Sequence, residues 1–286
     1  MDLAQLLVFA APVAIAAIGE CVNQRAGTLN IGLEGTMLAA AYFGMLTSLH
    51  TGSPWIGILV GMVVGTAFSA LQAYFVLRLA ADQVVVGTAI NLFALGLTST
   101  LFRTEFGSSG LLLSVPQIPK FWGVDMVVVA MVSFAFGAAW TLRRTKLGLA
   151  LRAAGEFPDA VAASGFSVLK LRFGAMLLGG ALGGLAGAYL SLGISGSFAE
   201  NMTAGRGFVA IAMVTFGRWK PIWVLAASML VGYAVSLQFV FQSKGWNIPF
   251  QLLSAAPYVL ALLVLVGAGR GSASPAALGK SFRSDR

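Results

Sequence analysis

The sequence has few of the residues that enzymes commonly use for chemistry. It contains one cysteine, Cys21, and one histidine, His50, among 286 residues. A single cysteine cannot form an internal disulfide, and no cluster of cysteine, histidine or carboxylate side chains accompanies His50 to form a metal site. No nucleophile elbow of the form Gly-x-Ser-x-Gly is present. We therefore expect neither a metal site nor enzymatic catalysis in this chain.

Charge is also scarce. Charged residues make up 10% of the chain and hydrophobic residues 58%, whereas soluble domains usually carry about 25% charged residues. A lipid bilayer accommodates such a chain, because a spanning helix needs only about 20 mostly apolar residues. The net charge of +8 does not indicate nucleic-acid binding, since the basic residues are scattered between apolar runs. The composition predicts an integral membrane protein with no nucleic-acid partner.

Apolar segments predict an all-α, polytopic helical bundle with about nine spans, within a range of eight to ten. No lysine or arginine precedes the first segment, so it lacks the basic region of a cleaved signal peptide. The seventh segment has 12 residues, which is too short for a straight crossing. It either begins near Ala199 or is a broken helix. The nine segments are 3–19, 31–49, 55–77, 83–102, 124–142, 173–193, 206–217, 222–241 and 251–267.

Basic residues predict the orientation of these spans. If segment 143–172 is cytoplasmic, fourteen of the 18 lysines and arginines fall on the cytoplasmic side. Only Arg103, Lys120, Arg206 and Lys244 fall outside. This bias follows the positive-inside rule and predicts a multi-pass protein of the cell membrane with its N-terminus outside and its C-terminus in the cytoplasm.

Two of the predicted spans carry glycine at every fourth position. Such spacing lets helix backbones approach closely in lipid. Close packing within one subunit is the favoured interpretation, and a seam between two subunits is the alternative. The glycines are Gly57, Gly61 and Gly65 in one span and Gly179, Gly183 and Gly187 in the other.

Polar residues surround the start of the second span. Residues 27–35 alternate glycine and polar side chains, a composition typical of an interrupted helix at membrane depth. A plain loop followed by an ordinary helix is the alternative. Asn30, Glu34 and Asn91 are the candidates for the translocation pathway, because polar groups at this depth usually face the protein interior or a wet cavity. A structural contact or a helix cap is the other interpretation of Glu34.

The segment 143–172 is the only long hydrophilic stretch, with six basic and two acidic residues. Pro158 suits a first helical turn, Asp159 complements a helix N-terminus, and Gly165 suits the position after a helix end. We expect a short helix here that either rests on the membrane surface or docks onto a cytoplasmic partner. The tail, residues 269–286, is rich in Gly, Ser, Ala and basic residues and predicts a disordered cytoplasmic segment. Its residues 274–281 nearly match a phosphate-binding loop, but Ser274 replaces the first glycine and too few residues follow for the required helix.

Three segments resemble permeases of the ribose and nucleoside branch of bacterial ABC importers, and are most similar to the nucleoside type. Residues 27–35 (GTLNIGLEG) are similar to the early signature of that family. Residues 152–160 (RAAGEFPDA) with 163–165 (ASG) resemble its coupling segment, and residues 205–212 (GRGFVAIA) with 216–219 (FGRW) its late signature.

The resemblance implies a type II importer-like fold with inverted repeats, in which residues 1–268 form the permease domain and 143–172 the coupling loop. It implies separate ATPase subunits that bind ATP and magnesium, an extracytoplasmic substrate-binding protein and a second permease. A related but different chain is the favoured second permease, and an identical copy remains open. The chain itself then has no cofactor. The coupling residues implied are Arg152, Gly155, Glu156, Asp159, Ala160, Ala163 and Gly165.

The function expected from these observations is transport of a nucleoside, driven by ATP hydrolysis in another subunit. A simple sugar remains open as the solute. An ion-coupled secondary transporter is the second hypothesis, and a membrane enzyme the third. An ATPase gene and a binding-protein gene beside this one would favour the first hypothesis over the second.

Overall fold

The computed structural model describes residues 3–107, 114–121, 123–243 and 274–280, with the single positions 255, 259 and 282. This part of the chain is mostly helical and contains one antiparallel pair of short strands, β1 (Lys120–Phe121) and β2 (Val124–Asp125). The helices are α1 (Leu3–Arg25), α2 (Leu33–Thr51), α3 (Pro54–Ala73), α4 (Gln83–Phe106), α5 (Met126–Arg144), α6 (Lys146–Glu156), α7 (Pro158–Ala163), α8 (Val168–Tyr189), α9 (Arg206–Phe216) and α10 (Pro221–Ser243). The π-helical turns η1 (Tyr74–Arg78) and η2 (Leu190–Ser195) continue α3 and α8.

Side-chain caps fix where several helices begin. Asp82 accepts hydrogen bonds from the amides of Val84 and Val85 at the start of α4. Asp125 caps α5 in the same way, Thr145 caps α6 and Ser167 caps α8. Each cap pairs an amide that the first helical turn leaves without a partner.

Five helices in the described residues are long and apolar enough to cross a membrane. They are Ala4–Arg25, Pro54–Arg78, Gln83–Phe106, Met126–Arg144 and Val168–Ser195. The seventh predicted segment is α9, which has 11 residues and begins at Arg206, not near Ala199. At 1.5 Å per residue it covers about half of a 30 Å hydrocarbon core. The predicted segment 251–267 lies outside the described residues apart from two positions, so nine spans remain a prediction.

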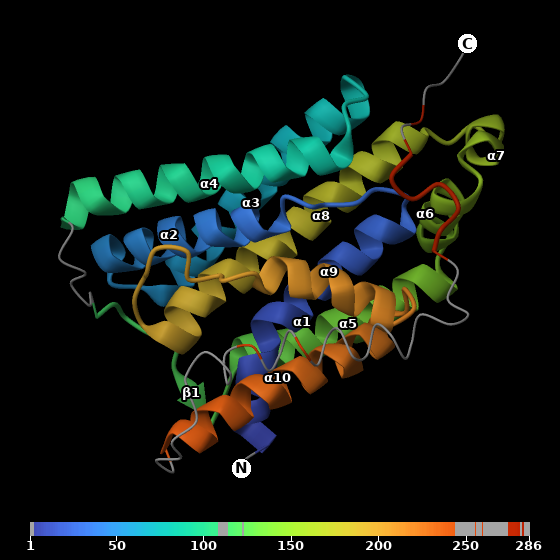
Figure 1. Cartoon of the computed structure of the whole chain (residues 1–286). Helices are drawn as coiled ribbons and strands as arrows, with labels where there is room; N and C mark the ends of the chain where they lie inside the picture. The colour runs from blue at the N-terminus through green and yellow to red at the C-terminus, as the bar shows by residue number, and fades with distance from the viewer. Residues whose placement is uncertain are drawn as a thin grey trace.

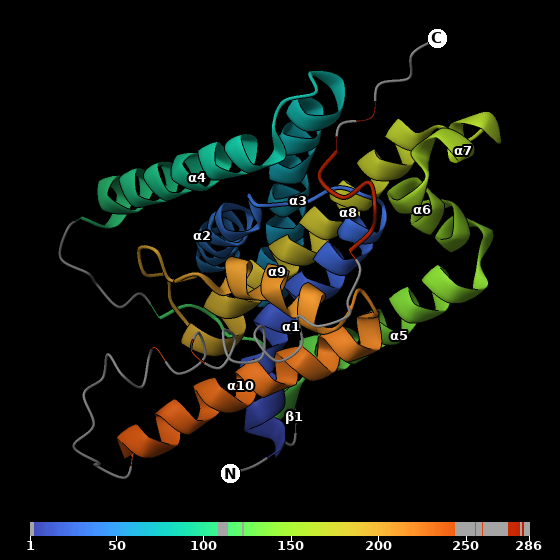
Figure 2. The same cartoon turned by 45° about the vertical axis from the view of Figure 1, so that its right-hand side comes forward.

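The centre of the bundle is formed by α1 and α8. Both are 78% buried over their most apolar windows, whereas α4 is 22% buried. In Figures 1 and 2, α3 and α4 lie on one side of this pair, and α5 and α10 on the other. The outer helices expose large apolar side chains such as Val85, Leu92 and Phe136, which suits contact with lipid. The short helices α6 and α7 lie at the end of the bundle opposite the N-terminus.

Glycine packs α3 directly against α8. A Cβ at Gly65 would overlap the backbone of Gly180 and Gly184, and one at Gly61 would overlap the side chain of Ala188. These glycines therefore serve helix contact within one chain. This confirms the favoured interpretation of the four-residue spacing.

Residues 274–280 form turns that lie on α6. The amide of Ala277 donates to the carbonyl of Gly155 at 2.9 Å, and the amide of Gly279 donates to the carbonyl of Gly27 at 3.2 Å. The expectation of a disordered tail therefore does not hold for this segment, because its backbone pairs with two other parts of the chain.

Candidate functional site

Residues 26–32, here named the interrupted segment, separate α1 from α2, and both sequence interpretations, an interrupted helix and a plain loop before an ordinary helix, predict such a stretch. Residues 26–32 are not helical and run back along the bundle from the end of α1 (Figure 1). The amide of Asn30 donates to Glu20 Oε1 at 3.1 Å, and the amide of Leu29 donates to Gln83 Oε1 at 2.7 Å. Glu20 lies five residues before the end of α1, so the segment re-enters the bundle. Buried side chains thus pair backbone groups that lipid could not satisfy.

Asn91, a predicted pathway residue, holds the start of α2. Its Nδ2 donates to the carbonyl of Ile31 at 2.9 Å, and its Oδ1 accepts from the amide of Gly35 at 2.7 Å. A Cβ at Gly35 would crowd the backbone of Asn91. The two contacts fix the angle at which the interrupted segment enters α2.

Glu34 connects the two halves of the sequence. Its Oε1 accepts from the amide of Gly205 at 2.7 Å, and its Oε2 accepts from the amide of Gly207 at 2.6 Å. These amides lie at the N-terminus of the half-length helix α9, where a carboxylate is favoured by both hydrogen bonding and the helix dipole. The contact agrees with the structural-cap interpretation of Glu34. Glu34 and Gly205, which it caps, are 171 positions apart in the sequence.

Unpaired polar atoms lie beside the interrupted segment. Asn30 is 1% exposed and its Nδ2 donates to Ser69 Oγ at 3.3 Å, while its Oδ1 has no partner. Gln72 is fully buried, and neither polar atom of its amide has a partner. Buried polar atoms are usually hydrogen-bonded, so these free donors and acceptors can bind water or a polar solute. Gln72 was not predicted from the sequence, because one glutamine in an apolar span carries no motif.

The predicted coupling residues divide into two groups. Asp159, Ala160, Ala163 and Gly165 are exposed on or beside α7. Gly165 has a φ of +83°, which a side chain would strain. The helix begins at Pro158 and ends at Ala163, so the expected short helix is present with a free surface.

The other three predicted coupling residues make contacts within the chain. Arg152 lines a cavity against the ends of α1 and α5. A Cβ at Gly155 would overlap the carbonyl oxygen of Arg25, so α6 approaches α1 closely. Glu156 Oε2 accepts from the amide of Ala276 at 3.2 Å. The structure therefore places these three where α6 meets the bundle and the tail.

Two exposed aromatic residues flank α7. Phe157 is 70% exposed and Phe166 is 55% exposed. Exposed apolar patches usually indicate a contact surface. The sequence places both in the hydrophilic segment, but their exposure depends on how Val161 packs α7 against α8. Val161 is buried with Val168 and Ala154.

Arg172 joins α6 to the interrupted segment and the tail. Its guanidinium is buried and donates to the carbonyls of Ala26 at 3.1 Å, Ala154 at 3.2 Å and Lys280 at 2.8 Å. These carbonyls belong to the first residue of the interrupted segment, to α6 and to the tail. Arg172 therefore connects α6 directly to the segment that leads to Asn30.

The remaining candidates have local roles. Cys21 is a buried free thiol in the core, and His50 lies on α2 with Nδ1 2.8 Å from the carbonyl oxygen of Leu46. In the part of the chain that the structure describes, no group of histidine, cysteine and carboxylate side chains could hold a metal ion. The segment similar to a phosphate-binding loop forms the turns that contact α6.

Comparison with known proteins gives concordant matches over most of the chain. The guanosine ABC transporter permease protein NupQ of Bacillus subtilis is 32% identical, covering 96% of this chain and 97% of its own length. The nucleoside ABC transporter permease protein NupC of Lactococcus lactis is 34% identical, covering 92% and 90%. The putative glucose ABC transporter permease protein TsgC13 of Haloferax volcanii is 33% identical, covering 88% and 86%. No solved structure matches the chain.

Family membership follows from a wider match. Residues 3–268 match the model of one permease family. This region includes α1 to α10 and the interrupted segment. The matched region contains all three segments on which the resemblance to ABC permeases was based. The chain belongs to the family described as branched-chain amino acid transport system / permease component.

Proposed function

We propose that this chain is the membrane permease subunit of an ATP-driven importer and forms the translocation path for a nucleoside. The observation that carries the proposal is the family match over residues 3–268, together with two relatives named as guanosine and nucleoside permeases. A relative named as a putative glucose permease supports a simple sugar as the second candidate solute.

The solute path is proposed to pass the interrupted segment. The unpaired Oδ1 of Asn30 and the unpaired amide of Gln72 together offer acceptors and a donor, which suits the hydroxyl and base-edge groups of an uncharged nucleoside. Glu34 and Asn91 hold the flanking helix starts. Their proposed role is to position the path, and Asn30 is the proposed contact with the solute.

Coupling is proposed to begin at α7. An ATPase subunit that closes on ATP would press on the exposed surface of Ala160, Ala163, Phe157 and Phe166. The movement would pass through α6 and the three carbonyls bound by Arg172 to the segment that carries Asn30. ATP and magnesium belong to the ATPase in this proposal.

The proposed assembly contains two ATPase subunits, an extracytoplasmic substrate-binding protein and a second permease. Bacillus subtilis and Lactococcus lactis each have a further permease, NupP and NupB, at 26% and 23% identity to this chain. The partner permease is therefore proposed to be a different chain. The N-terminus is proposed to lie outside the cell membrane and the end with α6 and α7 in the cytoplasm.

Inverted repeats are proposed for predicted spans 1–4, residues 3–102, and 6–9, residues 173–267, of which the structure describes α1–α4 and α8–α10. In each part a central helix is followed by a non-helical segment with glycine before a second helix, at 26–32 and at 196–205. Glu34 bonds the second helix of one part to that of the other. This arrangement is the support for the proposed symmetry.

The decisive experiment combines uptake with subunit retention. The chain is expressed with its candidate ATPase, and ATP-dependent uptake of guanosine, other nucleosides and glucose is measured in proteoliposomes. Ala163→Glu adds volume and an unpaired charge to the proposed contact, which costs roughly 1–3 kcal/mol for overpacking alone. We expect this variant to insert normally, lose the ATPase during purification and lose uptake.

Thr51→Glu is the matched control, because it adds the same charge at an exposed position outside α7, the last residue of α2. It should retain the ATPase. Full recovery of the ATPase with Ala163→Glu, together with uptake that persists without ATP and follows an ion gradient, would replace the proposal with a secondary transporter.

A further inference from the structure

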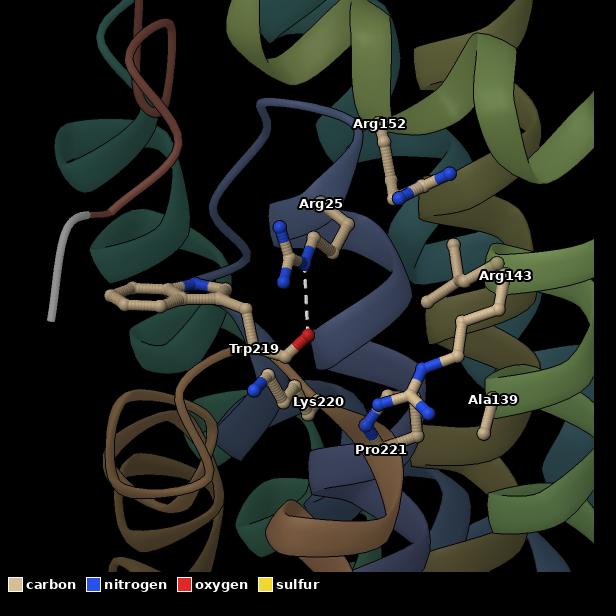
Figure 3. Close-up of a pocket in the computed structure, with 8 residues that line it drawn as sticks. Arg25, Ala139, Arg143, Arg152, Trp219, Lys220 and Pro221 are labelled. Atoms are coloured by element: carbon tan, nitrogen blue, oxygen red, sulfur yellow. Dashed lines mark hydrogen bonds between the residues drawn. The ribbon is translucent and has the colours of Figure 1, made fainter.

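A cavity of about 140 Å³ lies where the ends of α1 and α5 meet α6 and the turn between α9 and α10. Four of its lining residues are basic, Arg25, Arg143, Arg152 and Lys220. Figure 3 shows the guanidinium groups of Arg25, Arg143 and Arg152 arriving from three different helices around one space. Segments far apart in the sequence therefore converge to concentrate positive charge at one place.

The cations in this cavity are not neutralised by the residues that line it. No carboxylate is among the lining side chains. Arg25 Nε donates to the carbonyl of Trp219 at 2.8 Å, and Arg152 Nε is buried without a partner. The negative charge of Glu156 attracts Arg25. Glu156 Oε2 also accepts a hydrogen bond from the backbone amide of Ala276. Arg152 Nε is thus a free, fixed donor, and guanidinium donors of this kind are suited to phosphate oxygens.

The surroundings of the cavity are those of a membrane interface. Trp140, one turn before Arg143 on α5, is 64% exposed, and Trp223 near the start of α10 is 63% exposed. Exposed tryptophans at helix ends are typical of the headgroup level of a bilayer. The cavity is also lined by apolar Leu142 and Ala139, and Phe136 continues the exposed apolar surface of α5 toward the bilayer core.

We propose that this cavity binds the phosphate group of an anionic phospholipid, with its acyl chains along the exposed apolar surface of α5 and α10. Basic pockets between membrane helices recognise anionic headgroups through such clusters. The site is separate from the exposed surface of α7 and from the polar atoms beside Asn30. Because Arg25 ends α1 and Arg152 belongs to α6, a bound headgroup joins the coupling helix to the central helix.

Native mass spectrometry of the purified chain tests the site without requiring transport. The chain is mixed with equal amounts of phosphatidylglycerol and phosphatidylcholine in detergent, and retained lipid is counted. We expect phosphatidylglycerol to be retained preferentially. Arg143→Gln and Lys220→Gln lie on different elements and should each weaken retention roughly fivefold, the value expected for one cation near an anionic surface.

Arg144→Gln is the matched control, since Arg144 is the neighbouring exposed cation on α5 and does not line the cavity. It should retain lipid as the unchanged protein does, and all variants should elute as the folded protein in size-exclusion chromatography.

Four results would overturn the proposal. Equal retention of the two lipids, or equal losses with Arg143→Gln and Arg144→Gln, would show that the cavity does not recognise the headgroup. Full displacement of phosphatidylglycerol by millimolar inorganic phosphate would identify a site for a free anion. Loss of the ATPase from Arg143→Gln with unchanged lipid retention would identify an acidic side chain of that subunit as the occupant.

Discussion

At the scale of single residues, the carboxylate of Glu34 is the contact whose removal is easiest to interpret. It is 8% exposed and accepts two backbone amides at the start of α9. Glu34→Ala leaves both amides without a partner, and each buried group that is left unpaired costs about 1–3 kcal/mol. We expect a clear fall in the midpoint of thermal unfolding in detergent. Glu105→Ala removes an exposed carboxylate that accepts one hydrogen bond, from the Tyr42 hydroxyl, and should lower that midpoint less.

Two helical glycines provide a matched pair for testing the approach of α6 to α1. Gly155→Ala would drive a methyl group into the carbonyl of Arg25, and overpacking typically destabilises by about 1–3 kcal/mol. Gly137→Ala on α5 meets open space and should be neutral or stabilising by up to about 1 kcal/mol. The measurement is again thermal unfolding. Equal effects at both positions would mean that the close approach at Gly155 is not maintained in solution.

At the scale of elements, α7 carries a prediction about the contact with the ATPase. Phe157→Ala and Phe166→Ala each remove an exposed aromatic side chain, and aromatic anchors at interfaces commonly contribute more than 1 kcal/mol. We expect each variant to bind the ATPase at least about fivefold more weakly in a pull-down titration. Val85→Ala, which truncates a 68% exposed side chain on α4, should leave the affinity unchanged. An equal loss for Val85→Ala would remove α7 from the proposed interface.

Features set by residues close together in the sequence could be predicted, whereas contacts between distant residues could not. Local signals predicted a non-helical stretch near residues 27–35 and a short helix from Pro158, because glycine, proline and caps act within a few residues. The sequence identified Glu34 and Asn91 but not their partners, since Glu34 binds amides 171 and 173 residues away. Gln72 and Phe166 could not be predicted, because their roles arise from burial and exposure that only the packed bundle defines.

At the scale of the whole molecule, five of the described helices are long and apolar enough to span a membrane, and the other predicted segments remain predictions. The predicted segment 206–217 is apolar enough to be counted as a span, but its helix α9 has only 11 residues. The Glu34 carboxylate caps the N-terminus of this helix. Hydropathy reports composition and not the point at which a helix starts. Charge placement gives independent information, because it separates the two ends of the bundle.

The orientation of the bundle is tested by single cysteines in a chain with Cys21→Ala. Cys21 is buried, so its removal should leave the labelling background low. Thr51→Cys and Ser243→Cys should react with an impermeant thiol reagent in intact cells. Ser167→Cys should react only after the membrane is opened. Labelling of Ser167→Cys from outside would invert the proposed topology and place α7 on the wrong side for an ATPase.

The three carbonyls around Arg172 impose an order on biosynthesis. Ala26 and Ala154 are translated before the arginine, but Lys280 follows it by 108 residues. The nascent chain must therefore insert α9 and α10 while a buried guanidinium lacks one acceptor. Docking of residues 274–280 supplies the third acceptor, so we expect a chain that stops before residue 274 to be less stable at this end of the bundle.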